Sequence, residues 1–388
     1  MKIIACRLRE THIPFKVSFK HALHTRKEVQ GMILEVELSD GQIGYGECLP
    51  RDYVTGETHQ SVISALSDIV LPALLNKSFS SFGELKQWLH SFFEVHNINN
   101  RQTCVLAITE LALLDAFAKS TQSSVYKLFS SDITTHTVPD IRYSGTYSLG
   151  SHEAFKRYQS VYDQLSLKQF KVKVGTDLDA ELALIDKIRS ANSGDIEIRL
   201  DANGAWDLNQ AIDALQKFAD KGVVCCEQPM PVELKAAYPE LVSKFKGIID
   251  ICIDESLCHY DDALWFAENA GATVFNLRVS KLGGISACLA IAKIAQAHDI
   301  DCQLGAQVGE TAILTAAGHT LAQLLPKCRF YEGAFGTYLL EQDITHPSVM
   351  FAHAGKLPMS LLKENAGFGI EVDQDLISKV TYQSHNFS

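Results

Sequence analysis

The chain has 388 residues, enough for a barrel together with a second module, and an apolar share of 46% excludes a largely disordered protein. Its 35 basic and 46 acidic residues give a formal net charge of −11, which argues against nucleic acid or an anionic membrane surface as a partner. The first residues lack the apolar stretch of a signal peptide and no apolar run is long enough to span a bilayer, so the sequence predicts a cytoplasmic protein.

The amino-terminal part, residues 1–130, reads as an α+β domain. Leu34, Val36 and Leu38 alternate with polar residues, which is typical of a half-buried strand. Asp40-Gly41 then indicates a tight turn, and residues 42–47 return as the partner strand. Helical patterns follow at 58–75, 81–95 and 102–120.

Short β-rich runs recur every 25–30 residues beyond this domain, and an amphipathic helical pattern follows each of them. They lie at 139–146, 169–174, 196–201, 222–227, 249–254, 273–279, 300–306 and 328–333. Eight strands that alternate with helices favour a closed (β/α)8 barrel over residues 131–345, with 346–388 as a carboxyl-terminal segment packing back on the first domain.

A doubly wound open sheet is the structural alternative to the barrel. Against it, no G-x-G-x-x-G motif follows an early strand, and Gly44-Tyr45-Gly46 sits within a hairpin strand rather than at a strand-to-helix turn. The ten cysteines include no C-x-x-C pair, so we expect reduced, mostly buried thiols rather than disulfides or a zinc site.

Three consecutive strand runs end in an acid. The acids are Asp201, Glu227 and Asp254, spaced by 26 and 27 residues, about one strand–helix unit each. Neighbouring strands of a barrel place such positions side by side at the carboxyl-terminal rim, where crowded carboxylates repel unless a cation joins them. All-oxygen ligands suit Mg²⁺, although each acid taken alone is equally compatible with capping the following helix.

Two lysines lie on the strand before these acids. Lys171 and Lys173 are two residues apart, so their side chains point to the same side of the strand. A second positive charge and a divalent ion nearby disfavour the charged form of Lys173, and a neutral lysine can act as a general base. For K-x-K alone, a solvated strand edge is the competing interpretation.

A further lysine, Lys281, follows the run at 273–279. Its strand lies four positions from that of Lys173 in a ring of eight, so the two amines are expected to face each other across the barrel mouth. A substrate between them presents one face to each, which is what a two-base 1,1-proton transfer needs. A solvent-exposed loop lysine is the alternative.

These motifs together resemble the muconate-lactonizing subgroup of the mandelate racemase/muconate lactonizing enzyme family, in the enolase superfamily. The resemblance rests on Lys171-x-Lys173, Asp201-Ala202-Asn203-Gly204, Glu227-Gln228-Pro229, Asp254-Glu255-Ser256 and Lys281-x-Gly283-Gly284. Two further stretches are similar to dipeptide epimerases. They are the amino-terminal region, from Phe19-Lys20-His21-Ala22-Leu23 through Gly44-Tyr45-Gly46-Glu47 to Val54-Thr55-Gly56-Glu57-Thr58, and the tail Gly367-Phe368-Gly369-Ile370-Glu371-Val372.

The resemblance implies a modified TIM barrel under an α+β capping domain, and it assigns roles. Asp201, Glu227 and Asp254 would bind one Mg²⁺ per subunit, with Mn²⁺ as a substitute. Lys173 and Lys281 would be the acid/base pair, while Lys171 would position the substrate carboxylate and hold down the pKa of Lys173. The superfamily pattern of a lysine or histidine base with Mg²⁺ stabilising an enediolate is a general one.

Secondary candidates follow the same motifs. Asn203 and Glu255 come after predicted ligands and are expected to orient them. Glu310 and Glu332 are expected as rim acids, with a helix N-terminus as the alternative for Glu310. Cap loops that would close over the substrate contribute Thr25, Arg26, Arg51 and Tyr53. Structural roles are expected for Asn276 and Arg278 inside the barrel and for His319 on a helix.

The reaction itself stays open at this level. The cap favours an epimerase or racemase acting on a dipeptide or N-acyl amino acid. However, the strand-eight region Phe330-Tyr331-Glu332-Gly333 lacks the Asp-x-Asp pair with which dipeptide epimerases bind an ammonium. Residues 335–344 look more like a muconate cycloisomerase, so a cycloisomerase or syn-eliminating lyase is the alternative, and a non-catalytic metal-binding barrel is a third possibility. The family also implies a homo-oligomer with a small-molecule carboxylate as substrate.

Overall fold

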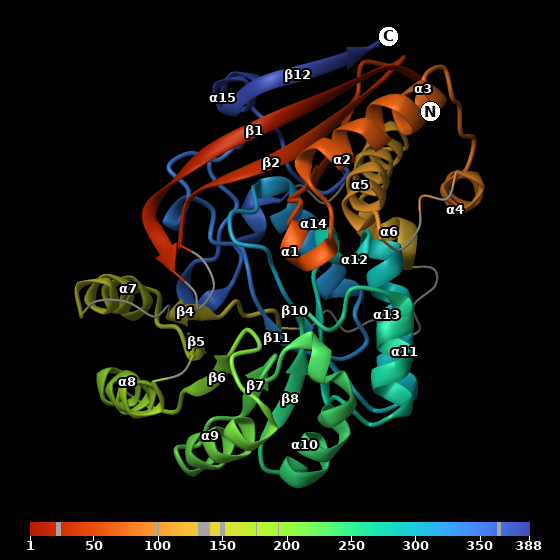
Figure 1. Ribbon diagram of the computed structural model, residues 1–388. Coiled ribbons are helices and arrows are strands. Elements are labelled where there is room, and N and C mark those ends of the chain that lie inside the picture. The colour runs from red at the N-terminus through yellow and green to blue at the C-terminus, as the bar shows by residue number, and fades with distance from the viewer. Residues whose placement is uncertain are drawn as a thin grey trace.

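The computed structural model describes residues 1–20, 25–96, 98, 101–130, 140–147, 152–175, 177–192, 194–362 and 366–388, and it leaves out the side chains of 17–20, 25, 26, 130 and 152–154. The molecule consists of two parts: a cap, which is an antiparallel sheet with helices, and a barrel, which is a parallel sheet surrounded by helices (Figure 1). Among the described residues, no helix is both long and apolar enough to cross a membrane.

The cap contains a four-stranded antiparallel sheet in the order β12-β1-β2-β3. Its strands are β1 (Ile3–Lys20), β2 (Thr25–Leu38), β3 (Ile43–Cys48) and β12 (Thr381–Phe387). The turn after Leu38 is the one that Asp40-Gly41 predicts, since the Leu38 N–H bonds to the Gln42 carbonyl at 2.9 Å. The long β1 and the distant β12 carry weaker local patterns, and they are not predicted from the sequence.

The cap helices follow the predicted segments closely. One continuous stretch comprises α2 (His59–Ala65), a π-helical turn (Leu66–Val70) and α3 (Leu71–Leu74), and it covers the range expected at 58–75. The other helices are α1 (Asp52–Thr55), α4 (Phe82–Val95), α5 (Thr103–Ser120) and α6 (Val125–Ser130).

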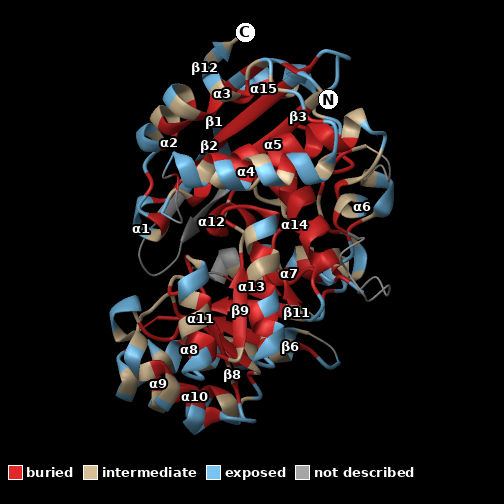
Figure 2. Ribbon diagram, turned by 90° about the vertical axis from the view of Figure 1, so that its right-hand side faces the viewer, coloured by how far each residue is buried: buried red, intermediate tan, exposed pale blue. Residues whose placement is uncertain are grey.

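Helix α5 is the central helix of the cap, buried along nearly its whole length (Figure 2). It packs directly on β3, because Gly44 and Gly46 leave room for its backbone. A Cβ at Gly44 would stand 2.3 Å from the Ala112 carbonyl oxygen, and one at Gly46 would stand 2.0 Å from that of Ile108. The Gly-Tyr-Gly motif is therefore a helix-packing surface on a hairpin strand, as its position in the sequence indicates.

The second sheet has eight parallel strands in the order β4 to β11, which confirms the strand count and the fold class. The strands are β4 (Gly145–Tyr147), β5 (Gln169–Lys173), β6 (Glu197–Asp201), β7 (Cys225–Glu227), β8 (Asp250–Ile253), β9 (Val274–Leu277), β10 (Asp301–Leu304) and β11 (Cys328–Tyr331). The sheet curls until its end strands meet, since the Ser144 N–H donates to the Tyr331 carbonyl at 2.9 Å.

Helices surround this curled sheet, each connecting one strand to the next (Figure 1). They are α7 (His152–Leu165), α8 (Leu178–Ala191), α9 (Leu208–Asp220), α10 (Tyr238–Phe245), α11 (Tyr260–Glu268), the single turn α12 (Val279–Leu282), α13 (Ile285–Ala297) and α14 (Ala312–Leu324). A 3-10 segment (Val232–Ala237) precedes α10, and short 3-10 turns lie at Gly336–Tyr338, His353–Gly355 and Met359–Leu361, before α15 (Gln374–Val380).

All ten cysteines are free, and nine of them are buried, as their spacing predicts. The domain limits expected at residues 130 and 345 stay predictions. Whatever the exact limits, the strand ends of the barrel sheet point toward the cap, and that junction is where the predicted site lies.

Candidate active site

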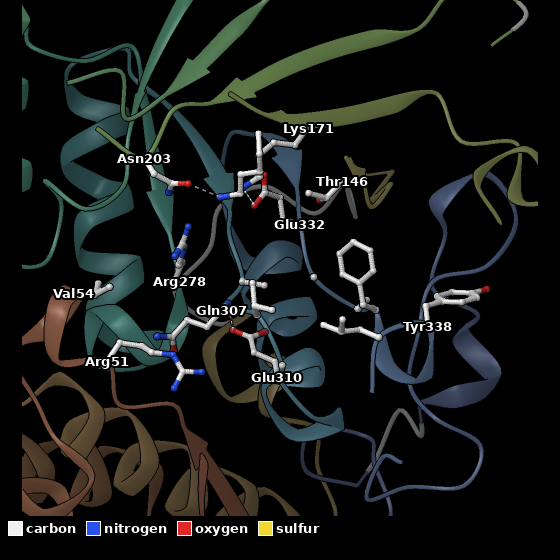
Figure 3. A pocket seen from close by; sticks show the side chains of 18 of the residues that line it. Arg51, Val54, Thr146, Lys171, Asn203, Arg278, Gln307, Glu310, Glu332 and Tyr338 are labelled. Carbon is white, nitrogen blue, oxygen red and sulfur yellow. Dashed lines mark hydrogen bonds and ion pairs between the residues drawn. The ribbon is translucent and has the colours of Figure 1, made fainter. Parts of the chain in front are cut away.

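A cavity of about 470 Å³ lies at the carboxyl ends of the barrel strands, and residues of the cap form part of its wall. Lys171 of β5 and Glu332, directly after β11, line it on one side, and Arg51 lines it from the cap (Figure 3). Lys173 of β5 and Tyr53 of the cap also line it. A concave site at this end of a parallel barrel is the position that the fold provides for catalysis.

The predicted acids are brought side by side by strand register. Lys173 pairs with Asp201 across β5 and β6, and Asp201 pairs with Glu227 across β6 and β7. Glu227 in turn faces Cys252 on β8, and Asp254 lies two residues farther on the same side. All three carboxylates are at most 1% exposed, so each needs a charged partner.

The two lysines of β5 supply part of that charge. Lys173 Nζ lies 2.5 Å from Asp201 Oδ2 and donates to Asn203 Oδ1 at 2.9 Å. Lys171 Nζ lies 2.6 Å from Glu332, 3.2 Å from Asp201 and 3.3 Å from Glu227. Both lysines therefore face the site rather than solvent, which settles the choice left open for K-x-K.

The charges around Lys171 keep it protonated. Burial acts to lower the pKa of Lys171, but the negative charges of Glu227, Glu332 and Asp201 outweigh it and raise that pKa above its ordinary value. Lys171 is therefore a fixed cation at the cavity floor, suited to binding an anion. The prediction that Lys173 works as a neutral amine stays a prediction.

Lys281 lies on α12, immediately after β9, and is fully buried. Its Nζ lies 2.7 Å from Asp254 Oδ1 and donates to the Asp254 carbonyl, also at 2.7 Å. It is not among the described residues that line the cavity, in contrast to Lys173. Lys281 is therefore not a solvent-exposed loop lysine. That it faces Lys173 across the barrel mouth stays a prediction.

Arg278 lies within the site, although the sequence predicts only a structural role for it. Its guanidinium contacts Asp254 and lies 3.2 Å from Glu227 Oε1, and it also lines the cavity. Burial acts to raise the pKa of both acids, yet the charge of Lys171 on Glu227 and that of Arg278 on Asp254 lower it below the ordinary value. Both carboxylates are therefore ionised.

The donor set fits a hard divalent cation. Three buried carboxylates at neighbouring strand ends, with those of Glu227 and Asp254 held ionised by Lys171 and Arg278, are the oxygen ligands that Mg²⁺ prefers. As the side chains stand, no group of three His, Cys, Asp or Glu within the described ranges converges on one point, because each acid turns toward a lysine or arginine. The metal-binding role of these acids stays a prediction.

Of the two predicted orienting residues, Asn203 contacts a predicted ligand, whereas Glu255 contacts Asn203. Asn203 N donates to Asp201 Oδ1 at 3.1 Å, and its side-chain amide donates to Glu255 Oε1 at 3.0 Å. Gln228, for which the sequence predicts no role of its own, accepts from the Asp254 N–H at 3.0 Å and the Ser256 N–H at 3.1 Å. It thereby fixes the backbone of the loop that holds Asp254.

Below the acids, the barrel interior carries a polar layer that, except for Asn276, is not predicted from the sequence. Asn276 Nδ2 donates to Glu227 Oε1 at 3.0 Å and Gln303 Nε2 donates to Oε2 at 2.7 Å. Arg199 contacts Gln303 and lies 3.3 Å from Glu332. The available signal was a single polar residue within each apolar strand, as in Ile198-Arg199-Leu200.

The remaining candidates divide into cavity residues and structural ones. Glu310 lines the cavity and also lies directly before the N-cap of α14, so both interpretations hold; burial raises its pKa to about 8. His319 is structural as expected: its Nδ1 meets the Tyr143 hydroxyl at 3.1 Å, and burial lowers its pKa to about 4. The side chains of Thr25 and Arg26 lie outside the described part of the chain.

Several further cavity residues had no sequence signal. They come from β1, α7 and the segment after β11, and include Lys16, Arg157, Phe335 and Tyr338.

A curled eight-stranded parallel sheet with acids and lysines at its strand ends, beneath an α+β cap, places the chain among the barrel proteins whose site lies at that rim.

Comparison with known families agrees with this class. Residues 3–130 match the mandelate racemase/muconate lactonizing enzyme N-terminal domain, and residues 153–376 match the enolase C-terminal domain-like family. The chain belongs to the mandelate racemase/muconate lactonizing enzyme family of the enolase superfamily, as its motifs predict.

Curated relatives of this chain are named as isomerases. A hydrophobic dipeptide epimerase of Enterococcus faecalis is 30% identical over 331 residues, covering 83% of this chain and 87% of the relative. An L-Ala-D/L-Glu epimerase of Bacillus subtilis is 27% identical, covering 91% and 93%. An N-succinyl-L-Arg/Lys racemase of Bacillus cereus is 25% identical, covering 98% of each chain.

Solved structures confirm the fold. A dipeptide epimerase from Enterococcus faecalis, in complex with Mg and the dipeptide L-Leu-L-Tyr, superposes with a TM-score of 0.81 at 26% identity, over 95% of this chain and 99% of the other. A muconate lactonizing enzyme from Pseudomonas fluorescens superposes with a TM-score of 0.83 at 24% identity, over 98% and 99%. The second likeness shows the fold alone.

Proposed function

We propose that this protein is a Mg²⁺-dependent epimerase or racemase that moves the proton on the carbon next to a substrate carboxylate. The observation that carries the proposal is the placement of two lysines on opposite sides of one row of acids. Lys173 ends β5 and pairs with Asp201, whereas Lys281 follows β9, four strands away, and pairs with Asp254.

The chain's own residues supply the proton transfer. Lys171 stays charged and binds the substrate carboxylate at the cavity floor. Lys173 as the neutral amine takes the α-proton and becomes an ammonium, which leaves the substrate as an enediolate. Lys281 as the ammonium returns a proton to the opposite face and becomes the amine, so that the configuration inverts and no atom is gained or lost.

Asp201, Glu227 and Asp254 would hold the Mg²⁺. When bound, the ion supplies concentrated positive charge beside the substrate carboxylate and so stabilises the second negative charge that develops as the proton leaves. For Lys281 to reach a substrate, its ion pair with Asp254 must open.

For the substrate, we favour an N-acyl amino acid over a free-amine dipeptide. An ammonium group needs an ionised acid, and of the four described acids that line the cavity, Glu332 contacts Lys171, Glu255 accepts from Asn203, and Glu233 is exposed to solvent. Glu310 holds its proton at neutral pH, since its pKa is about 8. Meanwhile Lys16, Arg51 and Arg157 add positive charge to the same wall.

One observation favours the alternative function. Only Lys173 of the two proposed bases lines the cavity, and a cycloisomerase or syn-eliminating lyase needs a single lysine as acid and base. The two functions differ in what Lys281→Ala does. A two-base epimerase would then exchange the α-proton of one enantiomer only, whereas a one-base enzyme would keep its reaction.

The test is proton NMR in D₂O with Mg²⁺, using each enantiomer of a panel of N-acyl amino acids, dipeptides and muconates separately. Loss of the α-proton signal together with growth of the other stereoisomer supports epimerisation. New vinyl or lactone signals would move the assignment to the lyase or cycloisomerase. Lys217→Ala, which removes an exposed lysine on α9, is the matched control and should behave as the parent.

A protein that only binds metal would show a different pattern. Lys173→Ala would then change neither metal binding nor any turnover, because there would be none to lose. Loss of α-proton exchange in Lys173→Ala, with circular dichroism and thermal unfolding unchanged, separates the catalyst from the binding module.

A further inference from the structure

The helical turn that carries Lys281 is enclosed by the cap. Ser280, the residue before Lys281, accepts a hydrogen bond from the Leu49 N–H at 3.1 Å, and its hydroxyl lies 3.9 Å from the Cys104 Sγ of α5. Leu106, also on α5, packs against Gly283. Leu49, Cys104 and Leu106 of the cap therefore contact α12 and the glycine that follows it, although Lys281 itself belongs to the barrel.

Glu110 on α5 makes the most specific of these contacts. It is 5% exposed, and its two carboxylate oxygens lie 3.2 and 3.4 Å from the backbone N of Ser286, in the first turn of α13. Gly284, the residue before α13, has no side chain with which to cap the helix. Glu110 thus supplies, from the cap, the hydrogen-bond acceptor that the start of α13 lacks.

The second glycine of the Lys281-x-Gly283-Gly284 motif makes room for this contact. Gly284 has a φ of +109°, and a Cβ there would stand 2.0 Å from Glu110 Oε2. Because Gly283 and Gly284 are the only two residues between α12 and α13, an anchor on the start of α13 also holds α12 and, with it, the backbone of Lys281.

We propose that Glu110 is a positioning residue for Lys281: helix α5 of the cap holds the backbone turn from which this lysine reaches the substrate. The docking of the cap therefore affects proton transfer by Lys281, on one face of the substrate. Proton transfer by Lys173, which lies on β5, does not depend on it. The effect on α-proton exchange rests on the proposed two-base function, whereas the anchoring of the turn by Glu110 does not.

The test compares Glu110→Ala and Glu110→Gln with Asp115→Asn. Asp115 is a matched control because it is a buried acid on the same helix, but it binds the N–H groups of Tyr45 and Phe368 rather than α13. In the full-length enzyme with Mg²⁺, α-proton exchange is measured for each enantiomer separately. Lys173→Ala and Lys281→Ala establish which enantiomer each lysine serves.

We expect Glu110→Ala to slow α-proton exchange for only one of the two enantiomers. Glu110→Ala should slow exchange of the enantiomer served by Lys281 by about 10- to 100-fold, the effect of a displacement near 1 Å, and leave the other enantiomer unchanged. Glu110→Gln, which keeps an acceptor oxygen, should recover most of the rate. Asp115→Asn should affect both enantiomers alike. Equal losses on both faces in Glu110→Ala, or no loss, would overturn the proposal.

A second readout does not depend on activity. Amide hydrogen exchange over residues 279–286, followed by mass spectrometry, should accelerate in Glu110→Ala and not in Asp115→Asn. If the parent enzyme exchanges no α-proton, the proposed function fails, and this measurement alone decides whether Glu110 anchors the turn. Unchanged amide protection in Glu110→Ala would refute the anchoring.

Discussion

Replacing Glu47 with glutamine should remove one defined contribution to the pH dependence of stability. Glu47 lies on β3 of the cap and is 1% exposed, and its carboxylate accepts from the backbone N–H groups of Thr311 and Leu314, both at 3.0 Å, at the start of α14. Burial is the main cause that raises its pKa from 4.5 to about 7; the hydrogen bonds from Thr311 and Leu314 oppose the rise, and the charge of Asp343 adds to it.

The sign of the effect follows from proton binding. Because the folded-state pKa is raised, the folded protein holds the Glu47 proton at pH values where the unfolded chain has released it. The free energy of unfolding contributed by this group is therefore full below about pH 4.5 and decreases as the pH rises through about 7. A shift from 4.5 to about 7 corresponds to about 3 kcal/mol.

The assay is urea unfolding of Glu47→Gln and of the parent at several pH values between 5 and 8. Relative to the parent, the variant should gain stability with rising pH, by up to about 3 kcal/mol across the full range, or about 4 °C in Tm for a chain of 388 residues. The control is Glu84→Gln, which removes a fully exposed acid whose pKa is lowered by hydrogen bonds from Ser80. Parallel pH profiles for Glu47→Gln and the parent would refute the reasoning.

Three further outcomes are expected. Lys173→Ala should lose about 100- to 10,000-fold in turnover while its circular dichroism stays unchanged, and retained turnover would remove Lys173 from the mechanism. Chelation should abolish activity and added Mg²⁺ should restore it, whereas calorimetric titration should show weakened Mg²⁺ binding in Glu227→Gln; full activity in excess EDTA would contradict the metal assignment. Gly284→Ala should lower Tm more than Gly247→Ala, since both glycines have positive φ but only the first meets a neighbour, Glu110, within 4 Å. The excess loss should shrink when Glu110→Ala is added, and equal losses from the two glycine variants would contradict the close approach.

The eight barrel strands could be predicted because a strand covered on both faces is apolar along its length and ends where polar residues resume. The agreement is closest for 169–174, observed as Gln169–Lys173, and for 196–201, observed as Glu197–Asp201. It is poorest for 139–146, where the strand begins only at Gly145 and Tyr143 forms an isolated bridge with Tyr331.

The floor of the site could be predicted for the same reason. Strand register converts a regular spacing in sequence into neighbours in space, so the spacing of Asp201, Glu227 and Asp254 is enough to place them together. The sequence predicts only a structural role for Arg278, because no local pattern shows that the side chain one residue past β9 lines the cavity.

The contacts between cap and barrel could not be predicted. Glu47 and Glu110 lie within apolar segments of the cap, where a single acid carries no pattern, and their partners are 264 and 176 residues away in the chain. Such pairs are set by how two domains dock, and periodicity within either domain contains no information about that docking.

The pairing of β1 with β12 has a consequence for how the protein is made. Cys6 lies opposite Phe387, so the edge of the cap sheet joins a strand synthesised before the barrel to one synthesised after it. Strand β12 is translated after the barrel, and until then the outer edge of β1 has no partner strand. During synthesis, the exposed β1 edge is a place where a chaperone, or a second nascent chain, can bind before the native strand arrives.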